Sequence, residues 1–193
     1  MNNPLFLLVG PSGSGKTTVA EELDKSYSYK SVQSYTTRPP RYDGETGHVF
    51  ISNAEFDELE NIVAYTEYNH HRYCTTKEQL DASNVYVVDI PGVETLLQNY
   101  TADRPIIVFY FDSTVTTRID RMIDRNDSDT AIVGRLHNDE AFDWYDKLDH
   151  IVWHYAHIKN KNVELYKINA NKSKEEVLEM VLYYVRQSME GYE

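Results

Sequence analysis

Short apolar runs alternate with longer stretches of helical periodicity along most of this chain. The apolar runs are as short as buried parallel strands usually are, and they cover residues 5–9, 84–89 and 105–111. Helical patterns lie between and after them, near residues 15–26, 91–99, 113–125 and 173–188. The last pattern places apolar side chains at core-facing spacing, at Val177, Leu178, Val181, Leu182 and Val185. This alternation predicts an α/β fold in which helices cover both faces of a mainly parallel sheet.

Two segments interrupt the alternation. Residues 34–83 are polar and rich in Tyr, Arg and turn residues, with short alternating runs such as 62–66, and they predict a small mixed lobe inserted between strands. Residues 124–141 are strongly charged with little apolar periodicity, which predicts a mobile helical flap. We therefore expect one domain over 1–193, with a core made of 1–33, 84–123 and 142–193.

Composition narrows the possible partners and the location. The net charge is −12, whereas a protein that binds nucleic acid normally presents a basic face, so we expect no nucleic-acid partner. Cys74 is the only cysteine, which excludes an internal disulfide and suits a reducing cytoplasm. The apolar run after Pro4 is far shorter than the roughly 20 residues that span a bilayer, and no basic segment precedes it. We expect a cytoplasmic monomer or homodimer with no membrane partner.

A phosphate-binding loop is predicted at residues 10–17, which match the pattern G-x-x-x-x-G-K-[ST] in full. The loop follows a predicted strand and opens a predicted helix, as this motif requires. Its glycines allow backbone N–H groups to form a concave anion site at the helix N-terminus. Lys16 can reach the β- and γ-phosphates of ATP, and the Thr17 hydroxyl can hold Mg²⁺. We expect the ATP phosphates to be bound by Ser12, Gly13, Ser14, Gly15, Lys16, Thr17 and Thr18.

A second anion site is predicted at residues 34–41, which read Ser-Tyr-Thr-Thr-Arg-Pro-Pro-Arg. A phosphate monoester carries nearly two negative charges, and two guanidinium forks flanked by hydroxyls match its oxygens. The two prolines between Arg38 and Arg41 fix the spacing of these forks. The segment resembles the one with which guanylate kinases hold the phosphate of GMP.

The resemblance to the guanylate kinase family extends over most of the chain. Residues 44–50 resemble the family's Gly-Glu stretch, which ends in an aromatic strand, and residues 73–77 resemble its Tyr-Gly-Thr/Ser segment. Residues 87–92 resemble its Asp-x-Asp strand end, and residues 118–136 resemble its arginine-bearing lid. About five matched segments in the right order are much more specific than a phosphate loop alone.

This resemblance implies a fold and a set of site residues. The fold is a P-loop three-layer α/β/α domain, in which 34–83 is the lobe that binds the nucleoside monophosphate (NMP) and 124–141 is the lid. The implied substrate contacts are Ser34, Arg38, Arg41, His48, Glu67, Tyr73, Thr75 and Asp89, and the implied catalytic cations are Lys16, Arg121, Arg125 and Arg135. Asp89 would act with Thr17 on Mg²⁺, although an Asp at the end of a strand also serves as a helix cap.

Several positions depart from the family pattern. The guanine-reading Glu of the family sits nine residues before the Tyr that Tyr73 matches, where this chain has Ala64. Glu67 lies three residues further on, which points it to the opposite face of a strand unless a bulge or a shifted alignment re-aims it. His48 replaces a phosphate-contacting Tyr. It can donate a hydrogen bond and its charge could help, although packing explains a lone histidine equally well. Val87 replaces the first Asp of the Asp-x-Asp pair.

The predicted activity is transfer of the ATP γ-phosphoryl group to GMP or dGMP with Mg²⁺. Two alternatives stay open. Because Ala64 removes the expected base contact, the acceptor could be a different nucleoside or deoxynucleoside monophosphate. The chain could also be a guanylate-kinase-like binding module without catalysis, against which the intact Gly15-Lys16-Thr17 and the lid arginines argue.

Overall fold

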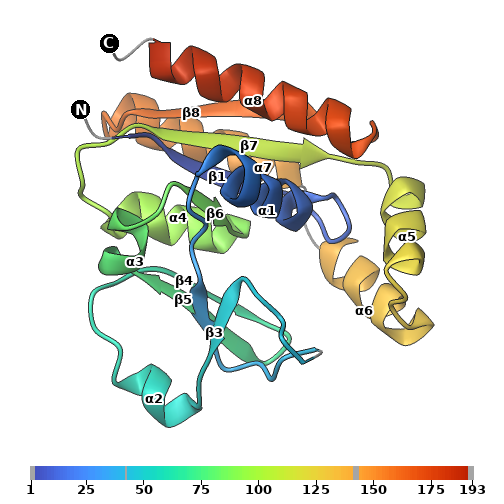
Figure 1. Ribbon diagram of the computed structural model, residues 1–193. Helices are drawn as coiled ribbons and strands as arrows, with labels where there is room; N and C mark the ends of the chain where they lie inside the picture. Colours follow the sequence, from blue (N-terminus) through green and yellow to red (C-terminus); the bar gives the residue numbers. More distant parts are fainter. Residues whose placement is uncertain (1–2, 42, 141–143, 191–193) are drawn as a thin grey trace.

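A four-stranded parallel sheet forms the centre of the molecule (Figure 1). The computed structural model describes residues 3–41, 43–140 and 144–190. The strand order is β6-β1-β7-β8, and the strands are β1 (Leu5–Val9), β6 (Val85–Val87), β7 (Ile106–Asp112) and β8 (Val163–Asn169). The three apolar runs predicted as strands are strands, although β6 is shorter than expected. The sequence analysis missed β8, because this edge strand is buried at only two of its seven positions and carries no continuous apolar run.

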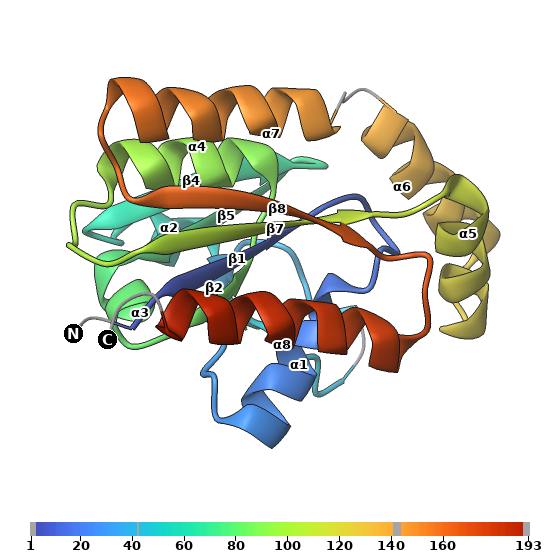
Figure 2. The ribbon, with the colours of Figure 1, turned by 90° about the horizontal axis from the view of Figure 1, so that it is seen from above.

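Helices cover both faces of this sheet, as the alternating pattern predicted (Figure 2). One face is covered by α4 (Ile90–Asn99) and by α7 (Trp144–Trp153), which continues into a π-helix at His154–Ile158. The other face is covered by α1 (Lys16–Tyr27) and α8 (Lys174–Glu190). Beyond the carboxyl end of β7 lie α5 (Val115–Asp124) and α6 (Asp129–Glu140). The three-layer α/β/α arrangement is confirmed.

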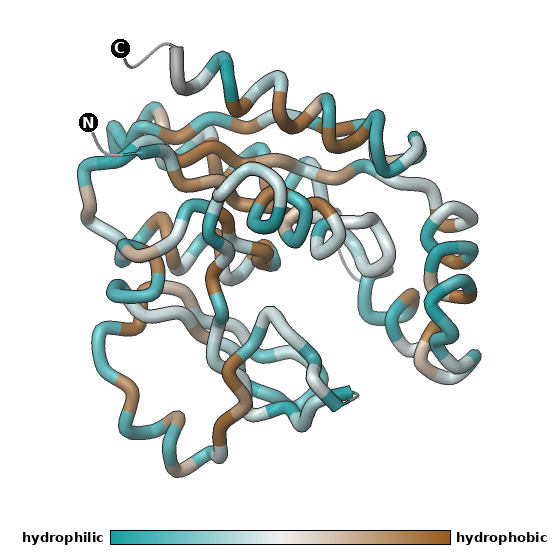
Figure 3. Tube along the Cα trace, viewed as in Figure 1, coloured by the Kyte–Doolittle hydropathy of each residue, from teal (hydrophilic) through white to brown (hydrophobic). Residues whose placement is uncertain are grey.

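The core consists of two apolar clusters, one on each face of the sheet (Figure 3). Alternate side chains of β1 contribute to each cluster, because successive residues of a strand point to opposite faces. Leu7 and Val9 pack with the α4 and α7 side, whereas Phe6 and Leu8 pack with the α1 and α8 side. All five β1 side chains are buried, which explains the uninterrupted apolar run that predicted this strand.

A second, smaller sheet lies below the first (Figure 1). Its order is β3-β2-β5-β4, made of β2 (Ser34–Thr36), β3 (His48–Phe50), β4 (Ile62–Tyr68) and β5 (His71–Thr76). Two short helices accompany it, α2 (Asn53–Asp57) and α3 (Lys77–Asp81), and each begins with a capping box. These elements fall within the range expected for the inserted lobe, and α6 falls within the range expected for the lid. The expected boundary between the lid, which ends at 141, and the last core segment, which begins at 142, lies outside the described residues.

Arg104 ties the start of β1 to the segment that leaves the small lobe. Its guanidinium donates to the carbonyl oxygens of Asn3, Pro4, Leu80 and Ser83 at 2.8–3.1 Å. One side chain thus satisfies four backbone acceptors from two separate segments. Among the described residues, no helix combines the length and apolar character that crossing a membrane requires.

Candidate active site

The phosphate loop joins β1 to α1 in the conformation that its glycines permit. Gly13 has φ +78°, and a Cβ at this position would lie 2.8 Å from the carbonyl oxygen of Arg118. Gly15, the residue before α1, has φ +95°. Both positions therefore require glycine. The Lys16 ammonium donates to the carbonyl oxygens of Gly10, at 2.6 Å, and Pro11, at 2.8 Å.

Burial, two carboxylates and two arginines together set the pKa of Lys16. Burial lowers its pKa to about 8, and the positive charges of Arg118 and Arg125 act in the same direction. The carboxylates of Asp139 and Asp89 oppose this shift. The ammonium is consequently easier to deprotonate than an ordinary lysine, and an anion bound beside it would favour the charged form.

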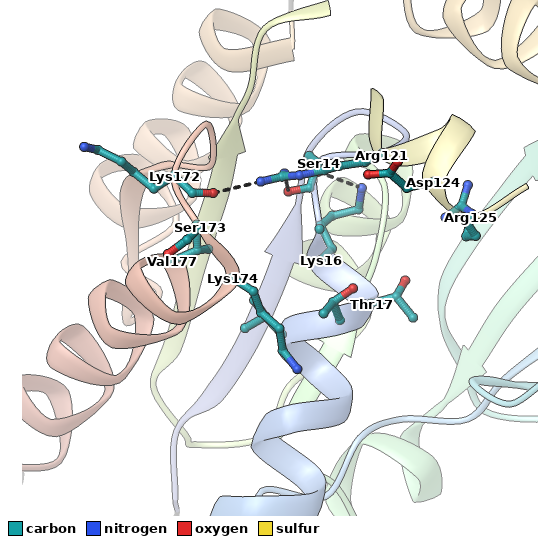
Figure 4. Close-up of a pocket in the computed structure, with 14 residues that line it drawn as sticks. Ser14, Lys16, Thr17, Arg121, Asp124, Arg125, Lys172, Ser173, Lys174 and Val177 are labelled. Carbon is teal, nitrogen blue, oxygen red and sulfur yellow. Dashed lines mark hydrogen bonds between the residues drawn. The ribbon is translucent and has the colours of Figure 1, made fainter. Parts of the chain in front are cut away.

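A cavity of about 570 Å³ opens beside the phosphate loop (Figure 4). It lies between the loop, α5 and the residues that follow β8, including Lys172 and Lys174. The guanidinium of Arg121 spans it by donating to the carbonyl oxygens of Ser14, at 3.1 Å, and Lys172, at 2.9 Å. The sequence analysis did not identify the residues after β8. Ligands bind at the carboxyl ends of parallel strands, so recognising β8 as a strand would have predicted them.

Five residues predicted to contact the acceptor phosphate come together in the small lobe: Ser34, Arg38, Arg41, His48 and Tyr73, which we call the lobe cluster. Strand pairing sets this arrangement, because Ser34 lies opposite His48 and Thr36 lies opposite Tyr73. The Ser34 hydroxyl is 2.9 Å from Nδ1 of His48, and the rings of His48 and Tyr73 are 5.8 Å apart.

Glu45 holds the two arginines of the lobe cluster. Its carboxylate accepts two hydrogen bonds from the Arg38 guanidinium, at 2.8 and 3.0 Å, and one from the Arg41 backbone N–H at 2.6 Å. Burial works against ionisation, but these bonds from Arg38 and Arg41 prevail and lower the pKa of Glu45. The sequence analysis matched Glu45 to a family segment and gave it no role. Its position next to Gly44, four residues after Arg41, was the feature of the sequence from which a pairing with the arginines could have been predicted.

His48 is neutral at physiological pH. Burial and the nearby Arg38 charge lower its pKa to about 4. The expectation that its charge helps to bind phosphate is therefore not supported by this environment. Its ability to donate a hydrogen bond is retained.

Glu67 and Asp89 lie on opposite sides of β4. Thr66 occupies the face toward Asp89 and donates its hydroxyl to that carboxylate at 2.8 Å, and Ala64, two residues earlier, is buried on the same side. The register of β4 shifts between Ile62 and Ala64, which is too early in the strand to re-aim Glu67. Glu67 instead accepts a hydrogen bond from Tyr65 on the opposite face. Thr75, which lies opposite Ala64, is buried with Ala64.

Asp89 is the N-cap of α4. Its Oδ1 accepts the Gly92 N–H at 2.9 Å, and its Oδ2 accepts the Thr66 hydroxyl. Burial raises its pKa, although both hydrogen bonds and the Lys16 charge oppose that shift. The capping alternative is therefore present in the structure. It does not exclude a second role, because each carboxylate oxygen can accept more than one bond.

Two lid arginines share one carboxylate. Asp127 accepts from Arg125 Nε at 3.0 Å and pairs with Arg135 Nη1 at 3.2 Å. One of them, Arg135, acts electrostatically on the lobe cluster: burial, the Arg38 charge and the Arg135 charge together lower the pKa of Arg41. Cations from the lobe and the lid therefore lie in one electrostatic field.

Comparison with known proteins agrees with this geometry. A family model described as guanylate kinase matches residues 2–152. A guanylate kinase of Agrobacterium fabrum is 29% identical over 71% of this chain and 68% of its own length, and one of Sphingopyxis alaskensis is 33% identical over 68% and 66%. One of Thermobifida fusca is 46% identical over 38% of this chain and 41% of its own length, so some matches span less than half of the relative.

The fold comparison agrees as well. The crystal structure of guanylate kinase from Anaplasma phagocytophilum superposes with a TM-score of 0.55 at 15% identity, and the match covers 97% of this chain and 87% of the other. That similarity concerns the fold alone. The family match, which covers more than half of the sequence, shows that the chain belongs to the guanylate kinase family.

Proposed function

We propose that this protein is an ATP-dependent kinase that transfers the γ-phosphoryl group of ATP to a nucleoside monophosphate, with GMP and dGMP as the first acceptors to consider. Family membership supports the reaction class. The observation that carries the proposal is the presence of two cationic anion sites, namely the phosphate loop with Lys16 and the lobe cluster, in which Glu45 holds Arg38 and Arg41. Such a concentration of cations suits a reaction in which two phosphates meet.

In this proposal the phosphate loop and the cavity beside it hold ATP. The loop N–H groups and Lys16 bind the phosphates, and the cavity lined by Arg121 and Lys174 has room for the rest of the nucleotide. The lobe cluster binds the acceptor phosphate. Its hydroxyls and two arginines, fixed by Glu45, match the oxygens of a monoester.

Catalysis by these residues is electrostatic. Negative charge spreads over the transferring group, and Lys16, Arg121, Arg125 and Arg135 neutralise it. No general base is required, because the attacking phosphate oxygen of the acceptor is already ionised. The protein contributes alignment of the two phosphates and exclusion of water from the closed site.

The residues at the mouth of the loop suit Mg²⁺. The hydroxyl of Thr17 and the carboxylate of Asp89 are hard oxygen ligands, which this ion prefers. When bound, Mg²⁺ would supply charge neutralisation at the β- and γ-phosphates. Among the described residues no group of three or more His, Cys, Asp or Glu side chains could hold a metal by itself, so we expect Mg²⁺ to enter with ATP.

We also propose that the lobe, 34–83, and the lid, 124–141, act as the two closing parts. A contact between them supports this, since the Asn138 amide of α6 donates to the Tyr68 hydroxyl at the end of β4 at 3.2 Å. Closure of this kind keeps water away from the γ-phosphate and limits wasteful hydrolysis.

A second candidate function differs only in the acceptor base. The methyl group of Ala64 cannot accept a hydrogen bond, and Glu67 lies on the opposite face of β4. A buried guanine N–H without an acceptor costs about 1–3 kcal/mol. The absence of an acceptor at this position favours a nucleoside monophosphate whose base has no N–H group there to be bonded.

The composition supports the remaining expectations. A net charge of −12 and a single cysteine fit a cytoplasmic protein that acts on small nucleotides without a nucleic-acid partner. We expect a monomer or homodimer without a membrane partner.

An assay of ADP formation from ATP and Mg²⁺ with a panel of ribo- and deoxyribonucleoside monophosphates tests the proposal. Turnover with any acceptor, abolished in Lys16→Met, supports the kinase. A preference for GMP or dGMP supports the first candidate, and a preference for another base supports the second. In the second case, Ala64→Glu should shift the preference toward guanine. Binding of ATP without turnover on any acceptor would contradict the kinase and favour a binding module.

A further inference from the structure

Asp139 is a buried carboxylate to which the reaction proposed above assigns no role. It is the last residue but one of α6, and its side chain is only 5% exposed. A buried charge destabilises the fold unless it is paired and hydrogen-bonded. The partners of Asp139 therefore show what this residue holds together.

Those partners come from three separate parts of the chain. The carboxylate pairs with Nη1 of Arg118 in α5 at 2.7 Å, and it accepts the backbone N–H of Ser12 in the phosphate loop at 2.9 Å. The backbone carbonyl of Asp139 accepts the indole N–H of Trp144, the first residue of α7, at 2.9 Å. The end of α6 is therefore joined directly to the loop expected to bind the donor phosphates.

Asp139 and Arg135 share one face of α6, because residues four apart lie one above the other on a helix. Asp139 is bonded to the phosphate loop, and Arg135 is paired with Asp127. The position of the Arg135 guanidinium thus depends on where the end of α6 is held.

An anchor is needed at this point because the cations nearby repel one another. Arg135 lies in the field of Arg41, and Arg118 and Arg125 lie in the field of Lys16. Without bound phosphates, the repulsion between Lys16 and Arg125 favours movement of the lid away from the loop, and that between Arg41 and Arg135 favours movement of the lid away from the lobe. Asp139 opposes it, since its negative charge acts on Lys16 and its bonds fasten α6.

We propose that Asp139 is a positioning residue, which with Arg118 anchors α6 on the phosphate loop at Ser12 and thereby places Arg135 at the transferring phosphoryl group. The proposal rests on the kinase function proposed above. Asp139 itself does not touch the reacting atoms. Because the anchor already holds α6 in place, less conformational entropy is lost when the lid closes at each turnover.

The test removes the anchor without leaving a buried charge unpaired. In the double variant Arg118→Met with Asp139→Leu, both charges are replaced by apolar groups, a change that often leaves stability unaltered. We expect an unchanged circular dichroism spectrum and an ATP Kd within about threefold of the parent, with kcat lower by about tenfold or more. An unchanged kcat in the folded double variant overturns the proposal.

A second background separates positioning from a general structural effect. In an Arg135→Ala protein, the same double substitution should change kcat by less than about threefold, because the anchor would have no guanidinium left to place. An equal loss of kcat in both backgrounds overturns the proposal. Lys77→Met, which breaks an exposed pair with Asp81 on α3, serves as the matched control and should leave kcat unchanged.

If the double variant does not fold, Asp139→Asn replaces it. This amide keeps an oxygen for the Ser12 N–H and loses the charge opposite Arg118, so we expect a smaller loss of kcat that is again absent in the Arg135→Ala background. A loss that persists in that background overturns the proposal.

Hydrogen exchange distinguishes failure of this inference from failure of the kinase function. In the ligand-free protein, amides at 132–139 should exchange about tenfold faster or more in the double variant, while those at 177–185 in α8 stay protected. Unchanged protection of α6 overturns the anchor even if the protein is a kinase. Faster exchange of the α6 amides in the double variant, combined with no turnover of any acceptor by the parent protein, would support the anchor. It would overturn the claim that the anchor serves catalysis.

Discussion

Glu45 and Arg38 form a bidentate ion pair, with 2.8 and 3.0 Å between the carboxylate oxygens and the two guanidinium nitrogens. The Glu45 side chain is 5% exposed and that of Arg38 is 10% exposed, so water competes little for this pair. The carboxylate fixes one edge of the guanidinium, while Phe50 lies 5.2 Å from its centre. An arginine held in this way loses little further freedom when it binds a phosphate.

The first prediction concerns this pair. Glu45→Gln should raise the KM for the acceptor nucleotide by about 10- to 100-fold and leave the KM for ATP within about threefold, because the acceptor arginines lose their fixed geometry while the phosphate loop is unchanged. Steady-state kinetics with each substrate varied in turn measure both constants.

Glu55→Gln is the matched control for that experiment. Glu55 is an exposed carboxylate of the same lobe that bonds to the Ser52 backbone in a capping box. This change should affect stability by well under about 1 kcal/mol and leave both KM values unaltered. An equal rise of both KM values in Glu45→Gln would mean that Glu45 does not serve the acceptor site.

Lys16 gives a prediction about pH. Because its pKa is lowered to about 8, the free protein loses the Lys16 charge as the pH rises through 8, and ATP binding should weaken by up to about tenfold per pH unit above that value. Titrations of ATP binding between pH 7 and 10 measure this slope. Lys16→Met should bind ATP more weakly at pH 7 and show no such slope.

The same pKa predicts an opposite trend for the stability of the ligand-free protein. Between about pH 8 and the ordinary lysine pKa of about 10.4, the unfolded state binds more protons at this position than the folded state, so the free energy of unfolding rises with pH. Denaturant titrations of the parent should therefore gain stability relative to Lys16→Met between pH 7 and 9.5. A constant difference would contradict a lowered pKa.

The elements that sequence reasoning predicted are those whose signals are local. β1, the phosphate loop and α1 follow one another, and each carries its own pattern of apolar residues or glycines. β8 has no such pattern, because an edge strand needs few buried side chains. The roles of Glu45 and Asp127 were not predicted, since these residues act through the arginines that they hold in the folded chain. The role of Asp139 could not be predicted, because its hydrogen-bond partner Ser12 lies 127 residues away in the sequence.

His48 gives a further prediction about protonation. Its pKa of about 4 means that its imidazole C–H resonances should titrate near pH 4, well below the ordinary value of about 6.5. Between these values the unfolded state binds more protons, so this residue lowers the free energy of unfolding as the pH falls from 6.5 to 4.

Proton NMR measures that titration, and the spectrum of His48→Gln assigns the resonance among the seven histidines. The variant should also lose less stability than the parent between pH 6.5 and 4.5. A midpoint near 6.5 would restore the possibility that a charged His48 binds phosphate.

Arg104 provides a prediction about stability that is independent of function. Its guanidinium donates to four carbonyl oxygens, of Asn3, Pro4, Leu80 and Ser83, and removal would leave these acceptors without that partner. Arg104→Ala should lower the free energy of unfolding by about 2–3 kcal/mol, measured by urea titration. Arg104→Lys should recover less than about half of this loss, because an ammonium cannot reproduce the planar fork. Lys25→Ala, an exposed change on α1, should stay within about 0.5 kcal/mol of the parent. Full recovery by lysine would show that charge alone, and not the geometry of the guanidinium, joins the start of β1 to the exit of the lobe.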